Sequence, residues 1–399
     1  MFVFSCGLQM TEEELEKIEL LIVRTLLRNE DGFLSEILTD KDVRYKVGEE
    51  ILGKQLPYEK YKQYLSSALK KKMVRLTFRD KPTEDPLEAK ANRLQKHYGL
   101  QHLRIAPRAT EEGMPNEDLE LLGKEGARLF GDLINSATGH PTIGIGGGQT
   151  MFKVVSNLPP ITATELEIVA TNLVTRVPVK EVYDSVFLAM QVHWKCSNSA
   201  ALIASLPPLP RDGEDSVATM HRDLFQANKA IRDTFVKSLN PDIVFVGAGD
   251  FHAQSRTVER VWEHLQISYE ALKKSIPPPV GDINLCFYDA EGNDLTSVLA
   301  QKYLATRKQK MRFVQGSLFP DQPLCHPFLL ALNLQCFRKL VADGKKVILV
   351  AGGSQKANAI HPLLKSKVIN GLVTDERALE QLVKRIDDEN RSSGAPCTD

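Results

Sequence analysis

The sequence predicts a two-domain α/β protein: a winged helix-turn-helix-like domain at residues 1–85, then a large doubly wound α/β domain at residues 86–386. The first 80 residues hold helical patterns and one short alternating stretch. From Leu87 onward, apolar strand-like runs alternate with helical segments, and glycine-rich turns follow several of these runs. Such alternation is typical of an open parallel sheet covered on both faces. Residues 387–399 are polar and lack apolar periodicity, which predicts a disordered tail.

The N-terminal domain is expected to contain three helices and a wing. Residues 11–28 begin at the N-cap candidate Thr11 and carry apolar residues at helical spacing. Further helices are predicted at about 40–52 and 58–72. Residues 73–80 alternate between apolar and polar side chains, which favours a short strand.

The larger domain is expected to alternate strands and helices along its whole length. The predicted strands cover residues 103–107, 141–150 with a glycine loop, 166–171, 186–190, 242–249, 283–289 and 345–353. The predicted helices cover residues 87–100, 117–135, 216–239, 255–275, 326–343, 356–366 and 375–386. Several strands are near-continuous apolar runs, as expected for parallel strands buried on both faces.

The composition excludes several classes of protein. The chain has 51 Lys and Arg residues and 51 Asp and Glu residues, so no overall basic field attracts nucleic acid, and DNA contact would need a local patch. Its six cysteines form no CxxC pair, which favours a reducing compartment and argues against a zinc site. No run approaches the roughly 20 apolar residues of a membrane span. We therefore expect a cytoplasmic protein without membrane contact.

Three glycine-containing turns follow predicted strands, at residues 144–150, 247–250 and 352–356. Ligands of such sheets bind beyond the carboxyl ends of the strands. Each turn is expected to expose backbone N–H groups at the start of a helix, where anions are favoured. Thr150 adds a hydroxyl donor, and Lys356 adds a charge suited to phosphate. One such loop alone equally suits a tight turn; three together favour a phosphate or carboxylate site.

Neither ATP nor a dinucleotide is expected as a cofactor. The first turn matches neither GxxxxGK[ST] nor a convincing GxGxxG fingerprint. Among the remaining polar residues, Asp282 suits either a sugar hydroxyl contact or a turn. Asp289 favours turn chemistry and Asp375 favours N-capping of the last helix. Arg176 is expected to be solvated, and a catalytic role for His252 is the minority interpretation.

Five segments carry a resemblance to a known family. They are GIGGGQTM, DIVFVGAG, VGDINLCFYDAEGN, VILVAGGSQKANAI and NGLVTDERALEQLV, in that order along the chain. From about Leu87 to Lys384 the chain resembles the sugar-binding domain of SorC/DeoR-type bacterial regulators. The resemblance implies a fold related to sugar-phosphate isomerases and glucosamine-phosphate deaminases, a sugar or sugar-phosphate effector, and a homodimer or homotetramer.

The resemblance also implies roles for individual residues. Gly146, Gly148, Gln149 and Thr150 would form a phosphate loop, Gly247 and Gly249 would line the pocket floor, Asp282 would contact the sugar, and Lys356 would meet anionic oxygen. The chain departs from the family pattern at residues 171–178, where a glycine-rich turn is usual, so ligand contacts there are in doubt.

The N-terminal domain resembles the DNA reader of the same family more loosely. Residues expected toward the major groove are Tyr58, Glu59, Lys60, Lys62 and Gln63, and those expected at phosphates are Lys70, Lys71, Lys72 and Arg75. The alternative is a helical module for packing or dimerisation that does not bind DNA.

Three functions remain open at this point. The first is a DNA-binding transcription regulator controlled by a sugar phosphate. The second is an isomerase- or deaminase-like enzyme with Asp250 and His252 as acid–base candidates. The third is a sugar-phosphate sensor that no longer binds DNA. Fold likeness alone does not choose among them.

Overall fold

A computed structural model of the chain describes residues 86–108, 115–162, 165–172, 183–202, 227–251, 269–296, 298–299, 325–326 and 331–392. The chain divides into two compact units, Met1–Thr83 and Glu84–Asp399, and all of the described residues belong to the second. The predicted helices at 11–28, 40–52 and 58–72, the wing, and every predicted DNA contact from Tyr58 to Arg75 lie outside the described residues.

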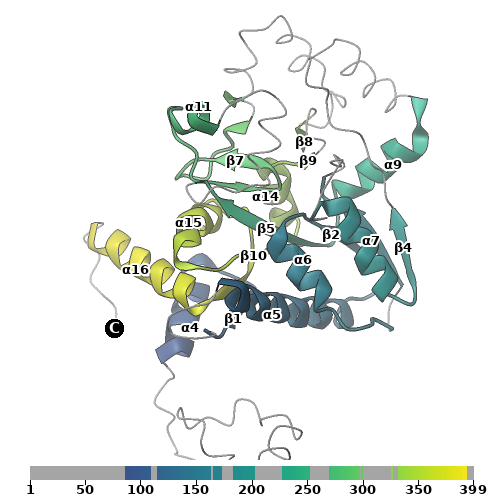
Figure 1. Ribbon diagram of the computed structural model, residues 1–399, viewed down its shortest axis with the longest axis horizontal. Coiled ribbons are helices and arrows are strands. Elements are labelled where there is room, and N and C mark those ends of the chain that lie inside the picture. The colour runs from purple at the N-terminus through teal and green to yellow at the C-terminus, as the bar shows by residue number, and fades with distance from the viewer. Residues whose placement is uncertain are drawn as a thin grey trace, which may run out of the picture. The chain divides into compact units, whose positions relative to one another are not determined.

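The second unit is built on a twisted, largely parallel sheet (Figure 1). Its parallel strands lie in the order β1 (His102–Ala106), β11 (Gly371–Asp375), β10 (Lys346–Val350), β5 (Ile243–Asp250), β2 (Thr142–Ile145), β3 (Leu166–Ala170) and β4 (Ser199–Leu202). From β2 the chain winds outward through β3 to β4, then returns to β5 and winds the other way through β10 to β11. The predicted doubly wound sheet is therefore confirmed, and its winding reverses between β2 and β5.

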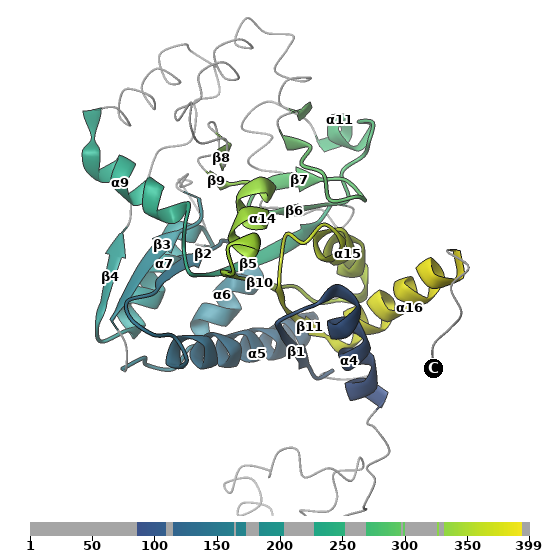
Figure 2. The ribbon, with the colours of Figure 1, turned by 180° about the vertical axis from the view of Figure 1, so that it is seen from behind.

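Helices cover both faces of this sheet (Figures 1 and 2). One face carries α5 (Pro115–Asn135), α6 (Gln149–Ser156) and α7 (Ser185–Lys195). The other carries α14 (Leu334–Ala342) and α15 (Ala357–Lys365), while α4 (Pro86–Tyr98) and α16 (Glu376–Ser392) pack together beside β1 and β11. None of the helices in the described segments is long and apolar enough to cross a membrane.

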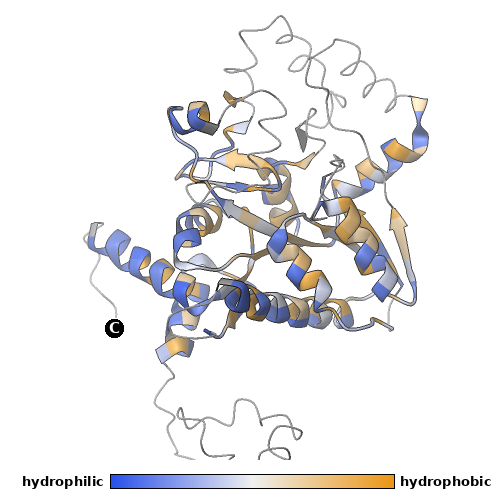
Figure 3. Ribbon diagram, viewed as in Figure 1, coloured by the Kyte–Doolittle hydropathy of each residue, from blue (hydrophilic) through white to orange (hydrophobic). Residues whose placement is uncertain are grey.

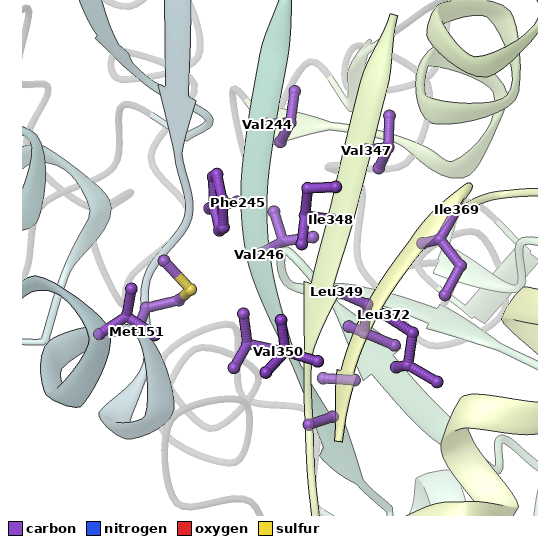
Figure 4. Close-up of a cluster of buried hydrophobic side chains, with 14 of the residues drawn as sticks. Met151, Val244, Phe245, Val246, Val347, Ile348, Leu349, Val350, Ile369 and Leu372 are labelled. Carbon is purple, nitrogen blue, oxygen red and sulfur yellow. The ribbon is translucent and has the colours of Figure 1, made fainter. Parts of the chain in front are cut away.

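The core lies between the central strands and these helices. Phe245 of β5 is fully buried and stacks on Phe130 of α5, with ring centroids 4.9 Å apart. Met151, Val246 and Val350 surround the same region (Figure 4). Apolar residues follow one another along β5 and β10 because both faces of these strands are covered. Helix α16 differs from these strands, because most of its residues are hydrophilic, as Figure 3 shows.

The segment at 283–289 is a hairpin, so the predicted single strand is wrong. Strands β6 (Gly281–Ile283) and β7 (Cys286–Tyr288) pair antiparallel around Asn284 and Leu285, both of which have positive φ values of 51° and 70°. Two such residues are typical of a tight type I′ turn, where asparagine tolerates the left-handed conformation. The end of β5 pairs with β6, so the predicted glycine turn at 247–250 is also wrong: these residues continue β5.

The predicted strand at 186–190 is also wrong, since these residues lie in α7. The carboxylate of Asp184 accepts a hydrogen bond from the backbone N–H of Phe187 at 2.7 Å and thereby caps this helix. Val186, Ala189 and Val192 are buried at helical spacing. A five-residue apolar run does not distinguish a strand from a helix; the polar cap in front of it does.

This cap gives a first testable prediction. Asp184→Ala removes the acceptor for the N–H of Phe187, so it should lower the free energy of unfolding by about 1 kcal/mol, whereas Asp184→Asn should retain most of it. Chemical denaturation of the two variants and the unchanged protein measures the difference. Equal stability of all three proteins would contradict the capping role.

Other element boundaries differ in detail. The predicted helix at 326–343 is replaced by two short strands, β8 (Cys325–His326) and β9 (Ala331–Leu332), followed by α14, which is capped by Asn333. A short 3₁₀ turn, η1 (Ser354–Lys356), precedes α15, and strands β4 and β11 were not predicted. Helix α16 continues to Ser392, so residues 387–392 are helical and do not belong to a disordered tail.

Helices α9 (Lys229–Ser238) and α11 (Tyr269–Lys273) occupy the ends of two predicted helices, whose preceding parts lie outside the described residues. The predicted turn role of Asp289 is confirmed. Its carboxylate accepts hydrogen bonds from the backbone N–H groups of Glu291 at 3.0 Å and Asn293 at 2.8 Å.

Candidate functional site

The three segments singled out for ligand binding lie at the carboxyl ends of β2, β5 and β10, which are neighbours in the sheet; residues 247–250 are the last residues of β5 itself. Their carboxyl ends lie at the point where the winding of the sheet reverses, the usual ligand position in such folds. Gly247 on β5 lies between the other two segments. A Cβ atom there would be 3.8 Å from both the Gly147 and the Val350 carbonyl oxygens. The sheet thus brings the predicted segments to one edge.

Two of the predicted amide donors in the loop between β2 and α6 donate to backbone carbonyl groups elsewhere in the protein. The N–H of Gly146 donates to the carbonyl of Phe245 at 2.8 Å, and the N–H of Gly148 donates to the carbonyl of Tyr183 at 2.7 Å. Gly148 also has a φ of 107°, a conformation that other residues avoid. These glycines therefore shape the loop rather than offering N–H groups to a ligand.

Donors that remain available lie at the start of α6. Among the described residues, none accepts a hydrogen bond from the N–H groups of Gln149 and Thr150 or from the hydroxyl of Thr150. Gln149 is exposed, whereas Thr150 is buried. The amino end of a helix carries partial positive charge, so this position favours an anion.

The loop after β10 is tied to the start of α16. One carboxylate oxygen of Asp375 accepts a hydrogen bond from the N–H of Gly353 at 2.5 Å. The other accepts from the N–H of Ala378 at 2.8 Å, which confirms the predicted capping role of Asp375. A Cβ atom on Gly352 would lie only 2.5 Å from the Asp375 carboxylate. The loop therefore fits closely around this carboxylate.

Lys356 ends this loop and faces a group of carboxylates. Burial lowers the pKa of Lys356, and the nearby carboxylates of Asp282, Asp250 and Asp375 oppose that shift. Asp250 and Asp282 are buried on paired strands, where Asp250 lies opposite Gly281 and Asp282 lies opposite Gly249. Asp282 therefore lies within strand β6.

The side chain of Tyr288 lies near two of these carboxylates, those of Asp282 and Asp250. Its hydroxyl donates a hydrogen bond to the carbonyl of Ala359 on α15 at 2.8 Å. Burial raises the pKa of Tyr288 well above its usual value, and the Asp282 and Asp250 carboxylates raise it further. The phenol consequently remains neutral and fixes the hairpin against the helix that follows Lys356.

Sequence reasoning missed a buried polar cluster of four residues beside the first loop. It comprises Thr171, Asn172, Ser185 and Asn284, all buried, from the end of β3, the start of α7 and the hairpin turn. The amide of Asn172 donates to the Ser185 hydroxyl at 2.6 Å and to the Asn284 oxygen at 3.2 Å. The only signal was that residues 171–178 lack the family's usual glycines.

The described segments contain no candidate metal site. None of their His, Cys, Asp and Glu side chains forms a group of three or more arranged to hold an ion. The side chains of Cys196, Cys286 and Cys336 are buried thiols that form no disulfide bond. The predicted Arg176 and His252 lie outside the described residues.

Comparison with known proteins identifies the family. Residues 82–317 and 338–384 match the family model described as "Putative sugar-binding domain". The chain belongs to this family. It is 26% identical over 296 residues to the erythritol catabolism regulatory protein EryD of Brucella abortus, covering 73% of this chain and 78% of EryD. It is 23% identical to the deoxyribonucleoside regulator of Bacillus subtilis, covering 80% and 86% of the two chains.

Solved structures of the family share the fold. The full-length sorbitol operon regulator SorC of Klebsiella pneumoniae aligns with a TM-score of 0.55 and 17% identity, covering 92% of this chain and 99% of SorC. A DeoR family transcriptional regulator from Listeria monocytogenes aligns with a TM-score of 0.53 and 22% identity, covering 75% and 100%. The predicted resemblance to SorC/DeoR-type sugar-binding regulators is therefore confirmed.

Proposed function

We propose that this protein is a cytoplasmic DNA-binding transcription regulator whose larger unit binds a phosphorylated sugar or polyol. The observation that supports this most directly is that three features follow or flank the carboxyl ends of the neighbouring strands β2, β5 and β10. These are the amino end of α6, the ammonium group of Lys356, and the buried carboxylates of Asp250 and Asp282. Membership of the sugar-binding family supplies the ligand class.

In this proposal the phosphate lies at the start of α6. The N–H groups of Gln149 and Thr150 and the Thr150 hydroxyl supply neutral donors, and Lys356 supplies a charge from the neighbouring loop. Gly146 contributes by allowing the loop to approach β5 closely, since a Cβ on Gly146 would lie 2.8 Å from Val246 Cγ1, and Gly148 contributes through its φ of 107°. Donors of this kind favour a phosphate over a neutral group.

The hydroxyl groups of the ligand meet carboxylates in this proposal. Asp282 and Asp250 accept hydrogen bonds from sugar hydroxyls, and Gly247 and Gly249 line the floor beneath them.

The DNA-binding part of the proposal rests on the named relatives. EryD, the deoxyribonucleoside regulator and SorC are named as regulators. We propose that Tyr58, Lys60, Lys62, Gln63, Lys70, Lys71 and Arg75 contact operator DNA, and that the protein acts as a homodimer or homotetramer. An effector shifts DNA affinity only as far as its own affinity differs between the DNA-bound and free states.

Helix α15 offers a route from the effector to the first helix of the larger unit. It begins directly after Lys356, and its His361 ring contacts Tyr98 at the end of α4, with centroids 6.1 Å apart. His361 also lies 3.3 Å from Glu389 on α16. We propose that movement of α15 on effector binding is transmitted to α4, whose amino end continues into the predicted DNA reader.

The experiment that tests this function uses the full chain. A panel of sugar and polyol monophosphates, each paired with its unphosphorylated counterpart, is screened by thermal shift. DNA from upstream of the protein's own gene is then tested by gel shift at several salt concentrations, with and without the best ligand. We expect a phosphorylated ligand to raise the melting temperature and to change DNA affinity, with strong salt dependence.

Other outcomes would favour other functions. Chemical turnover of the ligand would favour the isomerase- or deaminase-like alternative, with Asp250 and His252 as its acid–base candidates. The proposed relation of the fold to sugar-phosphate isomerases is the reason for this alternative. Ligand binding with no DNA binding would favour a sensor that acts through protein partners. No stabilisation by any phosphorylated sugar or polyol would contradict the proposal itself.

A further inference from the structure

We propose that Asn172 is a specificity-determining residue of the effector site, whose side-chain oxygen Oδ1 accepts a hydrogen bond from a hydroxyl group of the effector. This inference rests on the proposed function. It assigns a ligand contact to Asn172, the second residue after β3.

The orientation of the Asn284 side chain is set by its surroundings. Its Nδ2 donates to the backbone carbonyls of Thr171 at 3.0 Å and Leu332 at 3.1 Å. Carbonyl oxygens only accept hydrogen bonds, so the nitrogen must face them and the oxygen must face the other way. Asn284 Oδ1 then accepts from the Thr171 hydroxyl at 2.7 Å. All four hydrogen-bonding positions of Asn284 are filled once Asn172 is included.

The orientation of Asn284 fixes that of Asn172. Because the oxygen of Asn284 faces Asn172 at 3.2 Å, the group that Asn172 presents to it must be the donor Nδ2. The second hydrogen of the same Nδ2 goes to the hydroxyl of Ser185 at 2.6 Å. Both amide hydrogens of Asn172 therefore have acceptors, and its Oδ1 remains to accept a hydrogen bond from a ligand. Among the described residues, none donates a hydrogen bond to this oxygen.

Contacts on both sides place Asn172 within the candidate site. Its partner Ser185 lies against the first loop, since a Cβ atom on Gly147 would be 3.3 Å from the Ser185 hydroxyl oxygen. Its other partner, Asn284, follows directly after the β6 strand that carries Asp282. The backbone N–H of Thr171 donates to the carbonyl of Ile145 at 3.0 Å, which holds the end of β3 beside the end of β2.

An acceptor oxygen in a fixed orientation, such as Asn172 Oδ1, selects for ligands that carry a hydrogen-bond donor. The amide nitrogen of Asn172 is held by two hydrogen bonds, so Oδ1 can accept a hydrogen bond from a ligand hydroxyl, whereas a phosphate or carboxylate group brings only further acceptors. Discrimination against an analogue that lacks the hydroxyl is strong when a site is built around a hydrogen bond. Asn172 should therefore distinguish an effector from its deoxy analogue rather than set overall affinity.

The test combines Asn172→Ala with a series of deoxy analogues of the phosphorylated ligand found by thermal shift, with affinities measured by calorimetry on the full chain. We expect the variant to bind the ligand about 10- to 100-fold more weakly. For one deoxy analogue, the unchanged protein and the variant should bind equally well. The matched control is Asn358→Ala, an exposed asparagine on α15, which should leave every affinity unchanged.

Two outcomes would overturn the inference. If the unchanged protein binds the phosphorylated ligand but Asn172→Ala weakens every analogue equally, Asn172 supports the fold and does not contact the ligand. If Asn172→Ala does not fold, Ser185→Ala replaces it, because it loosens the orientation of Asn172; equal losses for all analogues again overturn the assignment. If no phosphorylated ligand binds the unchanged protein, the proposed function fails first and this inference fails with it.

Discussion

Gly281→Ala should lower the free energy of unfolding by about 3 kcal/mol, because the added methyl group has no room among its buried neighbours. A Cβ atom at this position would lie 2.5 Å from the Tyr288 hydroxyl oxygen, 2.8 Å from Ala359 Cβ and 2.8 Å from the Gly249 carbonyl oxygen. Tyr288 is fully buried and its hydroxyl is bonded to the Ala359 carbonyl, so it has little room to move. The hairpin that carries Asp282 must therefore shift away from α15.

Chemical denaturation of the full chain measures this loss. Gly131→Ala is the matched control, because a Cβ there meets no atom within 4 Å and the residue lies inside α5. Alanine is the better helix former, so the control should be neutral or more stable by up to about 1 kcal/mol. Equal stability of the two variants would show that the contacts around Gly281 are looser than described.

Lys356→Met should weaken binding of a phosphorylated effector by about 100-fold while changing the affinity for its unphosphorylated counterpart less than about threefold. The substitution keeps most of the apolar stem and removes the charge. Lys365→Met, at the end of the following helix α15, is the control: its ammonium is exposed and pairs with Glu389 at 3.4 Å, away from the proposed phosphate. Equal losses for both ligands would reject the role assigned to Lys356.

The same residue predicts a dependence on pH. Burial lowers the pKa of Lys356 from its usual value, so its ammonium loses its proton at a lower pH than that of an exposed lysine. Phosphate binding needs the protonated form. Affinity for the phosphorylated ligand should therefore fall as the pH rises through this lowered pKa. Calorimetry across the alkaline range should show that decline in the unchanged protein and not in Lys356→Met.

Local signals in the sequence predicted much of the fold. The apolar run of β10 indicated a buried parallel strand, and Asp375 ahead of a helical pattern indicated a cap; the structure confirms both. Residues 186–190 were misassigned because a short apolar run suits strand and helix alike. The hairpin at Asn284 was missed because its turn lacks glycine, and asparagine alone is a weak turn signal.

The candidate site was harder to predict than the fold. Sequence reasoning chose three segments that the sheet brings to one edge, because alternation of strands and helices predicts parallel strands, whose carboxyl ends lie at the same edge. It did not predict that Gly146 and Gly148 use their N–H groups on Phe245 and Tyr183, since those partners are distant in sequence. The cluster around Asn172 depends entirely on such distant contacts, which no local pattern records.

The central claim is that the start of α6 and Lys356 hold the same phosphate. A double-mutant cycle of Thr150→Val and Lys356→Met, measured by calorimetry with the phosphorylated ligand and its unphosphorylated counterpart, tests it most directly. We predict a coupling free energy of at least about 1 kcal/mol between the two substitutions for the phosphorylated ligand and none for its counterpart. Additive effects with both ligands would mean that the two residues serve separate sites, and the account would be wrong.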